Sequence, residues 1–199
     1  EPSGFTYAVG VDKFFETQGG DVGAARSITV GVDSSGTSKY QSQYLLAGAN
    51  VGSYAKASTN GFRIDNYNKG QVPSGGIYKY FADKFKSKAT TQSCNLTNTY
   101  TGLIYCGVGN GATISSVTTL GAGTNAVFFI DGDFNINNNL TLNCANDTAV
   151  YIVSGDIKVD AAVDRMDGVF IARKSFWDCV SVCVTNNKLT INGSLYVDG

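Results

Sequence analysis

The stretch "VFFIDGDFNI" (residues 127–136) decides the fold, because its pattern returns further along the chain. The segments "VYIVSGDIKV" (150–159) and "KLTINGSLYV" (188–197) align with it without gaps. Each has an apolar run, then a Gly followed by Asp or Ser, then apolar residues at alternate positions. A fourth copy, "VFIARKSFWD" (169–178), carries Lys174 where the others have the Gly. The last third of the chain is therefore an internal repeat.

The spacing of the copies predicts a β-solenoid. The aligned positions follow at steps of 23, 19 and 19 residues: Gly132, Gly155, Lys174 and Gly193. A step of about 20 residues corresponds to one coil of a solenoid, in which inward side chains stack on those of the neighbouring coils. We expect a mainly β chain, folded over residues 1–199 as one right-handed parallel β-helix. A sandwich of ordinary hairpins is the alternative, and the nearly constant spacing favours the solenoid.

The alternation within each copy predicts which side chains lie inside, because successive side chains of a strand point to opposite faces. The expected apolar columns contain Phe134 and Ile136, Ile157 and Val159, and Leu195 and Val197. Asp131, Asp133 and Asn135 should face outward. The segments "LTLN" (140–143) and "DGVFIA" (167–172) should add further strands to the same coils.

The first ninety residues are less regular. The segment "DKFFETQGGDVGAARSITVGV" (12–32) contains a Gly-Gly-Asp-Val that echoes the repeat and is expected to form a first coil. Residues 33–76, rich in Ser, Gly, Asn and Tyr, are expected to be an irregular insertion. Next, Ile77, Phe81 and Phe85 follow at steps of four, which predicts one amphipathic helix at about 77–88. The helix should flank or cap the solenoid, and an aromatic and basic stripe for a partner is its alternative role.

The chain ends at Gly199, directly after a repeat. Open strand edges at a solenoid end need a cover. We therefore expect either a continuation beyond residue 199 or another subunit stacked on this end.

Composition supports strands and argues against several partners. Only 16% of residues are charged, with 24 Gly and two Pro, which is typical of stacked strands and tight turns. A net charge of −1, from 15 basic and 16 acidic residues, gives no electrostatic reason to expect nucleic acid. No apolar run approaches the roughly 20 residues of a membrane span; the longest are 126–130 and 149–153.

The charge is distributed unevenly. Residues 1–90 hold ten basic and seven acidic residues, a balance of +3, and residues 91–199 hold five and nine, a balance of −4. A polar, solvated β surface is the simpler interpretation. A head-to-tail attraction between copies is the alternative.

The cysteines favour an oxidising compartment, and hence an extracellular or cell-surface location. None of the five forms a CxxC pair, and the chain has no His, so the usual zinc sites are not expected. Cys94 and Cys106 flank an uncharged segment that a disulfide would close. Cys179 and Cys183 could pair across a tight bend, which would leave Cys144 unpaired, or Cys144 could pair with one of them. Four Asn-x-Ser/Thr sequons are candidates for N-glycosylation: Asn95, Asn139, Asn146 and Asn192.

The sequence lacks the usual patterns of catalytic residues, which predicts a protein that is not an enzyme. Without His, the Ser-His-Asp and Cys-His arrangements are excluded in their usual forms. The acidic residues of "VDAAVDRMDG" (159–168), which are Asp160, Asp164 and Asp167 with Arg165, are expected to form a solvated turn with local Arg–Asp pairing.

A cation site is a weaker alternative, and no cofactor is expected. Asp133 and Asp156 occupy equivalent positions of successive coils, where they could share a Ca²⁺ ion. The stretch 131–142 fails as an EF-hand loop, because Ile136 stands at the required Gly and Leu142 at the required Glu.

Five segments carry a family resemblance. These segments, which resemble uncharacterised secreted and cell-surface proteins of candidate-phylum and related bacteria, are "FFETQGGDVGAARSI" (14–28), "YKYFADKF" (78–85), "NAVFFIDGDFNINNNLTL" (125–142), "AVYIVSGDIKV" (149–159) and "DGVFIA" (167–172). In that family an aromatic-x-x-x-Gly-Gly-Asp-Val segment opens a β-helix, and Val-Asp-Gly-Asp-Leu-x-Ile repeats follow. Where the family often has His-Ser, this chain has Gly23 and Ala24. The resemblance implies a β-helix at the cell surface and assigns no catalytic residue.

Two functional hypotheses follow. The first is a non-catalytic structural or adhesive protein of a cell surface or filament, which joins copies of itself or other surface proteins through its open ends. The second is a carbohydrate-binding or carbohydrate-cleaving β-helix, a polysaccharide lyase or hydrolase if catalytic, with surface Tyr residues stacking on glycans. Outward Tyr and Trp beside converging carboxylates would favour the second hypothesis.

Overall fold

The computed structural model describes residues 76–94, 96, 98–106, 109–178 and 189–198, and the backbone of the strands within residues 5–64, where Val22 and Gly23 also have a defined burial. In chain order the elements are β1 (Phe5–Thr6), β2 (Phe15–Gln18), β3 (Asp21–Ala24), β4 (Ile28–Thr29), β5 (Tyr40–Ala47), β6 (Ala55–Ile64), α1 (Gly76–Phe85), a 3₁₀ turn (Lys86–Lys88), β7 (Thr90–Thr91), β8 (Thr101–Cys106), β9 (Ala112–Ile114), β10 (Thr118–Leu120), β11 (Asn125–Ile130), β12 (Phe134–Ile136), β13 (Leu140–Leu142), β14 (Thr148–Val153), β15 (Ile157–Val159), β16 (Arg165–Ala172), β17 (Phe176–Asp178) and β18 (Leu189–Val197).

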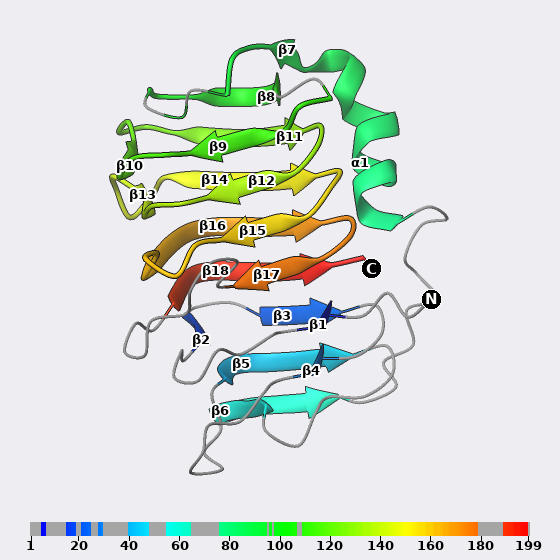
Figure 1. Ribbon diagram of the computed structural model, residues 1–199, viewed down its shortest axis with the longest axis vertical. Coiled ribbons are helices and arrows are strands. Elements are labelled where there is room, and N and C mark those ends of the chain that lie inside the picture. The colour runs from blue at the N-terminus through cyan, green and yellow to red at the C-terminus, as the bar shows by residue number, and fades with distance from the viewer. Residues whose placement is uncertain are drawn as a thin grey trace.

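The predicted β-solenoid is confirmed. The strands stack as parallel pairs, and successive short strands turn the chain through one coil (Figure 1). One face contains β8, β11, β14 and the end of β16; a second contains β9, β12, β15 and β17; a third contains β10, β13 and the start of β16. Strand β16 serves two faces because it bends at Gly168, where φ is +128°.

The copies at 127–136, 150–159 and 169–178 stack in the predicted register. The amide of Gly155 donates to the Gly132 carbonyl at 2.9 Å, and the amide of Lys174 donates to the Gly155 carbonyl at 3.3 Å. Phe134 lies opposite Ile157, and Ile136 lies opposite Val159. All four apolar side chains of these pairs are fully buried, whereas Asp131, Asp133 and Asn135 are half-buried and face outward.

The register predicted for the copy at 188–197 is wrong. Gly193 lies opposite Gly168 rather than level with Gly155, so Leu195 and Val197 stack on Phe170 and Ala172. They therefore belong to the column of the first face and not to that of Phe134. The same local pattern of an apolar run, a Gly and a second apolar run fits both corners of a coil. A Cβ on Gly193, where φ is +143°, would lie 1.9 Å from the Gly168 carbonyl oxygen, which explains the Gly at this second corner.

The end of the last repeat is covered within the chain, whereas a continuation beyond residue 199 stays a prediction. Strand β18 lies in the middle of the stack, between β16 on one side and β2 and β3 on the other (Figure 1). Its residues 189–192 pair with β2, and residues 195–197 pair with β3. The N-terminal coils therefore cover the C-terminal coil of the same chain.

The segment predicted as an irregular insertion contains solenoid strands. Within residues 33–76, β5 pairs with β2 and β3, and β6 pairs with β5, so both extend the stack at the end opposite to β8. The segment 12–32 does form part of a coil, as β2 and β3. Its Val22 lies opposite Leu195, on the first face, rather than in the column of Phe134.

A ladder of aromatic rings fills the interior of the upper coils: Phe128, Tyr151 and Phe170 are stacked, and Tyr100 meets Phe128 edge-on. Tyr100, Phe128, Tyr151 and Phe170 follow one another, with centroid distances of 5.3, 5.3 and 4.9 Å. Each ring comes from the next coil, because the strands that carry Phe128, Tyr151 and Phe170 are in register. The ladder is the physical form of the repeat seen in the sequence, since each coil buries the aromatic residue of its neighbour.

Helix α1 flanks the solenoid, as predicted, with a 3₁₀ turn completing the expected range (Figure 1). Its apolar residues Ile77, Tyr78, Phe81 and Phe85 pack on the outer side of the first face, against a column that includes Phe129, Ile152 and Ile171. The Tyr78 amide, in the first turn, donates to Asp198 Oδ2 at 3.2 Å. The residue after β18 therefore caps this helix.

Residues 92–94, 96 and 98–100 form a plug that closes the upper end of the solenoid. Leu96 is 2% exposed and belongs to the core, and Tyr100 adds the outermost ring of the aromatic ladder. The predicted disulfide between Cys94 and Cys106 is present, with a Cα–Cα distance of 5.3 Å, and it fastens the plug to the end of β8. Chain and disulfide together supply the cap that a solenoid end requires.

Candidate functional site

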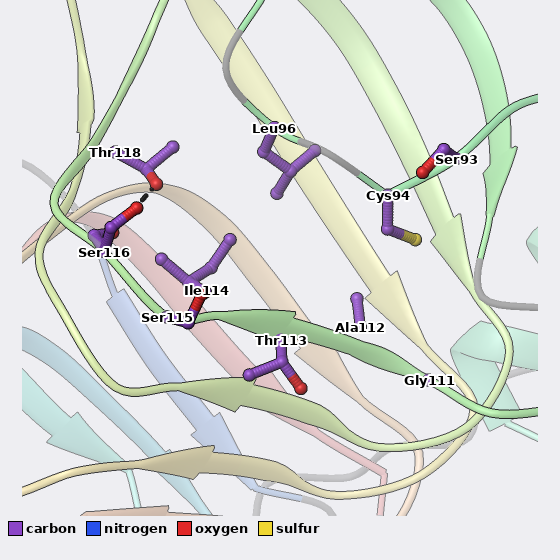
Figure 2. A pocket seen from close by; sticks show the side chains of 10 residues that line it. All are labelled: Ser93, Cys94, Leu96, Gly111, Ala112, Thr113, Ile114, Ser115, Ser116 and Thr118. Atoms are coloured by element: carbon purple, nitrogen blue, oxygen red, sulfur yellow. Dashed lines mark hydrogen bonds between the residues drawn. The ribbon is translucent and has the colours of Figure 1, made fainter.

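A hollow of about 480 Å³ lies between the plug and strand β9 at this end (Figure 2). Its lining consists of Ser93, Cys94, Leu96, Gly111, Ala112, Thr113, Ile114, Ser115, Ser116 and Thr118. The side chains of Leu96 and Ile114 extend toward each other across the hollow (Figure 2). The described lining residues are uncharged, so the site offers apolar surface, hydroxyl groups and backbone but no electrostatic attraction.

Strand β9 presents a free backbone edge to this hollow. Its other edge is used by β12: the Ala112 amide donates to the Asp133 carbonyl at 2.9 Å, and the Ile114 carbonyl accepts from the Asn137 amide at 2.9 Å. Because alternate residues of a strand direct their amide and carbonyl to opposite edges, those of Thr113 point away from β12. No strand pairs with this edge within the described residues. An extended chain could add here as a further parallel strand.

Little in the sequence indicates this site. Ala112, Thr113 and Ile114 look like any short strand, and residues 91–130 carry no charge that would mark a binding site. The hollow is created by a gap between an edge strand and a loop tied by a disulfide. The two cysteines were the available signal, because they mark the loop that lies over the strand.

The two acidic residues considered for Ca²⁺ do lie close together, but a lysine joins them. Lys158 Nζ lies 2.5 Å from Asp133 Oδ2 and 3.9 Å from Asp156 Oδ2. The Asp133 Oδ1 atom also accepts the Asp156 amide at 3.0 Å. The hydrogen bond from Lys158 holds the pKa of Asp133 below its ordinary value, and the same bond raises the pKa of Lys158.

This arrangement fits a structural ion pair better than a cation site, because the ammonium group lies against both carboxylates. No group of three or more metal-ligating acidic, Cys or His side chains occurs in the described ranges. Lys158 was not among the expected site residues, although the alternation places it outward, directly beside Asn135.

The acidic turn at 160–167 forms local pairs, as predicted for Arg165 and Asp167. The guanidinium of Arg165 donates from Nε and Nη2 to the two Asp167 oxygens, each at 2.8 Å. Asp167 is buried rather than solvated, and it also accepts the Leu142 amide and the Asn192 side-chain amide. Burial alone would raise the pKa of Asp167, but these donors lower it below its ordinary value on balance. The carboxylate thus serves to join three coils.

A second polar cluster fastens the 3₁₀ turn after α1 to the corner of the coils. Lys86 Nζ lies 4.2 Å from the centroid of the Tyr105 ring and 3.6 Å from Asp131 Oδ2. Asp131 accepts the Tyr105 hydroxyl at 2.7 Å and the Ser154 hydroxyl at 3.0 Å. The hydrogen bond from Tyr105 is the main reason that the pKa of Asp131 is below its ordinary value. A basic residue of the first ninety thus pairs with an acidic residue of the second half inside one chain.

In two of the four sequons, the side-chain amide of the Asn donates a hydrogen bond within the fold. The Asn139 Nδ2 group donates to Asp164 Oδ1 at 2.5 Å, and that of Asn192 donates to Asp167 Oδ1 at 2.7 Å. Because a glycan would be attached to this same nitrogen, the folded coil disfavours both positions. Asn146 lies in an exposed turn. Asn95 lies outside the described residues.

The remaining cysteines are only partly described. Cys144 is free and exposed in the turn before β14. Cys179 and Cys183 lie outside the described residues, so their predicted pairing stays a prediction.

The described aromatic residues do not gather into a sugar-binding groove. Of the large apolar side chains in the described ranges, Tyr80 on α1 and Val117 are the exposed ones. Trp177 is half-buried on the second face, beside Lys158. None of these residues lines the hollow, and the described lining contains no carboxylate.

Fold and site together define the class of this protein: a parallel β-solenoid with one flanking helix, closed at one end by a disulfide-fastened plug. Comparisons with protein-family models, curated proteins and solved structures find no match. In the described part of the chain, α1 is too short and too polar to cross a membrane.

Proposed function

We propose that this protein is a non-catalytic structural or adhesive component of a cell surface or extracellular filament. The observation that carries the proposal is the free edge of β9, which faces a neutral hollow at the end of a rigid stack. Such an edge can pair with an extended segment of another copy or of another surface protein.

Two further features support the proposal. The Cys94–Cys106 disulfide suits an oxidising compartment such as the cell exterior. The acidic residues that could have served catalysis, Asp133 and Asp167, are each held by several donors within the framework. In these positions they stabilise coil stacking.

The test blocks the β9 edge without changing the core. Thr113→Pro removes the outward amide, and Thr113→Val is the matched control that keeps this amide. Both should leave thermal unfolding nearly unchanged, because Thr113 is exposed and its amide points away from β12.

We expect the wild type and Thr113→Val to form higher assemblies, or to bind extracellular material, in sedimentation experiments. Thr113→Pro should remain monomeric and unbound. A strictly monomeric wild type that binds members of a glycan array would instead support a carbohydrate-binding protein.

A further inference from the structure

One inward column of the second face ends in a step from large to small side chains. Its residues on β17, β15, β12 and β9 are, in this order, Phe176, Ile157, Phe134 and Ala112. The aromatic ladder of the first face has no such step, because Tyr100 of the plug completes it. Beside Ala112, the space belongs to the hollow, which Ser93 and Cys94 line from the plug.

The backbone of Thr113 sets the register of any strand that adds to β9. In a parallel ladder, a residue bonds to the two residues that flank its Cα partner. Ala112 shows this pattern, because its Cα partner is Phe134 and its amide donates to the carbonyl of Asp133. On the free edge, Thr113 would likewise bond to the incoming residues that lie over Ala112 and Ile114. The side chains of these two incoming residues point inward, into the hollow.

We propose that the partner at this edge is an extended, uncharged peptide segment with a bulky apolar residue over Ala112 and a small residue over Ile114. This inference rests on the proposed function of the β9 edge. The bulky side chain continues the column that stops at Ala112, and close packing and buried apolar surface favour it. Only a small residue fits over Ile114, because Leu96 extends toward Ile114 there (Figure 2). The residue between the two faces outward and can be polar.

The lining of the hollow explains why the segment should be uncharged. Its described polar side chains are hydroxyl groups, which belong to Ser93, Thr113, Ser115, Ser116 and Thr118. An acidic or basic side chain directed into the hollow would lose its water without gaining an opposite charge. The hydroxyl groups and the free backbone of β9 can instead bond to the backbone of a neutral segment.

The test is an NMR titration of the full-length protein with short capped peptides that differ at one position. The parent peptide has the sequence Leu-Thr-Ala between Thr residues, and its variants replace the Leu with Ala or with Glu. We expect the Leu peptide to bind about tenfold to hundredfold more tightly than the Ala peptide, which is the gain from burying one such side chain. The Glu peptide should bind more weakly than either.

Two protein variants locate the binding. Ala112→Leu occupies the space over β9, so the Leu and Ala peptides should bind to it with equal affinity. Thr113→Pro removes the amide that pairs with the peptide and should abolish binding of both, whereas Thr113→Val should bind as the wild type does. Thermal unfolding of each variant shows whether it is folded. The comparison of the Leu and Ala peptides on the wild type decides the proposal even if Ala112→Leu does not fold.

Failure of this inference is distinct from failure of the proposed function. If the wild type assembles and Thr113→Pro does not, but the Leu peptide binds no more tightly than the Ala peptide, the edge keeps its function and the assigned partner is refuted. A preference for Leu that persists in folded Ala112→Leu also refutes it, because the side chain would then lie elsewhere. A wild type that remains monomeric and binds none of the peptides refutes both.

Discussion

Removal of the Cys94–Cys106 disulfide tests whether the plug closes the solenoid. The variant is Cys94→Ala/Cys106→Ala, which keeps every other cysteine. The crosslink closes a loop with a sequence separation of 12. The loss of closure entropy for a loop of this length is worth about 2.8 kcal/mol at 25 °C. Cys106 is fully buried, so loss of its sulfur adds a smaller packing cost.

The effect should be localised to the upper end. Leu96 and Tyr100 depend on the plug for their burial, and the plug also forms one wall of the hollow. We therefore expect faster amide hydrogen exchange in β8 and β9, with little change in β14 and β15. The strands below keep both stacking partners, whereas the first coil loses its cover.

The assay is urea unfolding of the wild type and the double variant, each with and without a dithiol reductant. The four measurements form a cycle that removes contributions from the other cysteines. We expect the reductant to destabilise the wild type by about 2.8 kcal/mol more than the variant. A difference below about 0.5 kcal/mol would show that the disulfide does not hold the cap, and would refute this reasoning.

Three further predictions concern single side chains. The Tyr151 hydroxyl is buried without a hydrogen-bond partner in the described structure, so Tyr151→Phe should be neutral or stabilising by up to about 1 kcal/mol in thermal unfolding, and a clear loss would contradict this. Asp198→Ala should lower the free energy of unfolding by about 1 kcal/mol, and Asp198→Asn by less, because the carboxylate caps α1. Equal stability of the wild type and both variants would show that Asp198 does not cap the helix. The folded pKa of Asp133 lies below its ordinary value of 3.8. The contribution of its carboxylate to folding stability is therefore complete above about pH 3.8 and is lost as the pH falls through the folded pKa. Lys158→Met should raise this pKa and weaken the acid dependence, as measured by NMR titration of the carboxyl carbon; an unchanged midpoint would show that Lys158 is not its cause.

The sequence predicted the parts of the fold that local chemistry determines. Alternating residues such as Phe134 and Ile136 have one stable arrangement on a coil, with their apolar side chains inside. Ile77, Phe81 and Phe85 likewise have one buried helical face. Cys94 and Cys106 were predicted as a pair because they bracket an uncharged loop, and the structure joins them.

Features set by distant contacts could not be read in this way. Gly193 fits two corners of a coil equally well, and only its contact with Gly168 decides between them. Strands β5 and β6 have few long apolar runs, so their own sequence does not mark them as strands. Their pairing with neighbouring strands in the stack defines them. The β9 site depends on a backbone edge, which has no residue signature, and on a neighbouring loop that is marked only by its two cysteines.

The placement of β18 between the two ends of the chain is the central claim, and its amides test it directly. Those of Thr190 and Asp198 donate toward β16, at 2.8 and 2.9 Å. By strand alternation, those of Ile191 and Leu195 are directed toward β2 and β3. Hydrogen exchange measured by NMR should therefore show all four amides protected to a similar degree. Fast exchange at Ile191 and Leu195, with protection kept at Thr190 and Asp198, would show that the N-terminal coils do not cover β18.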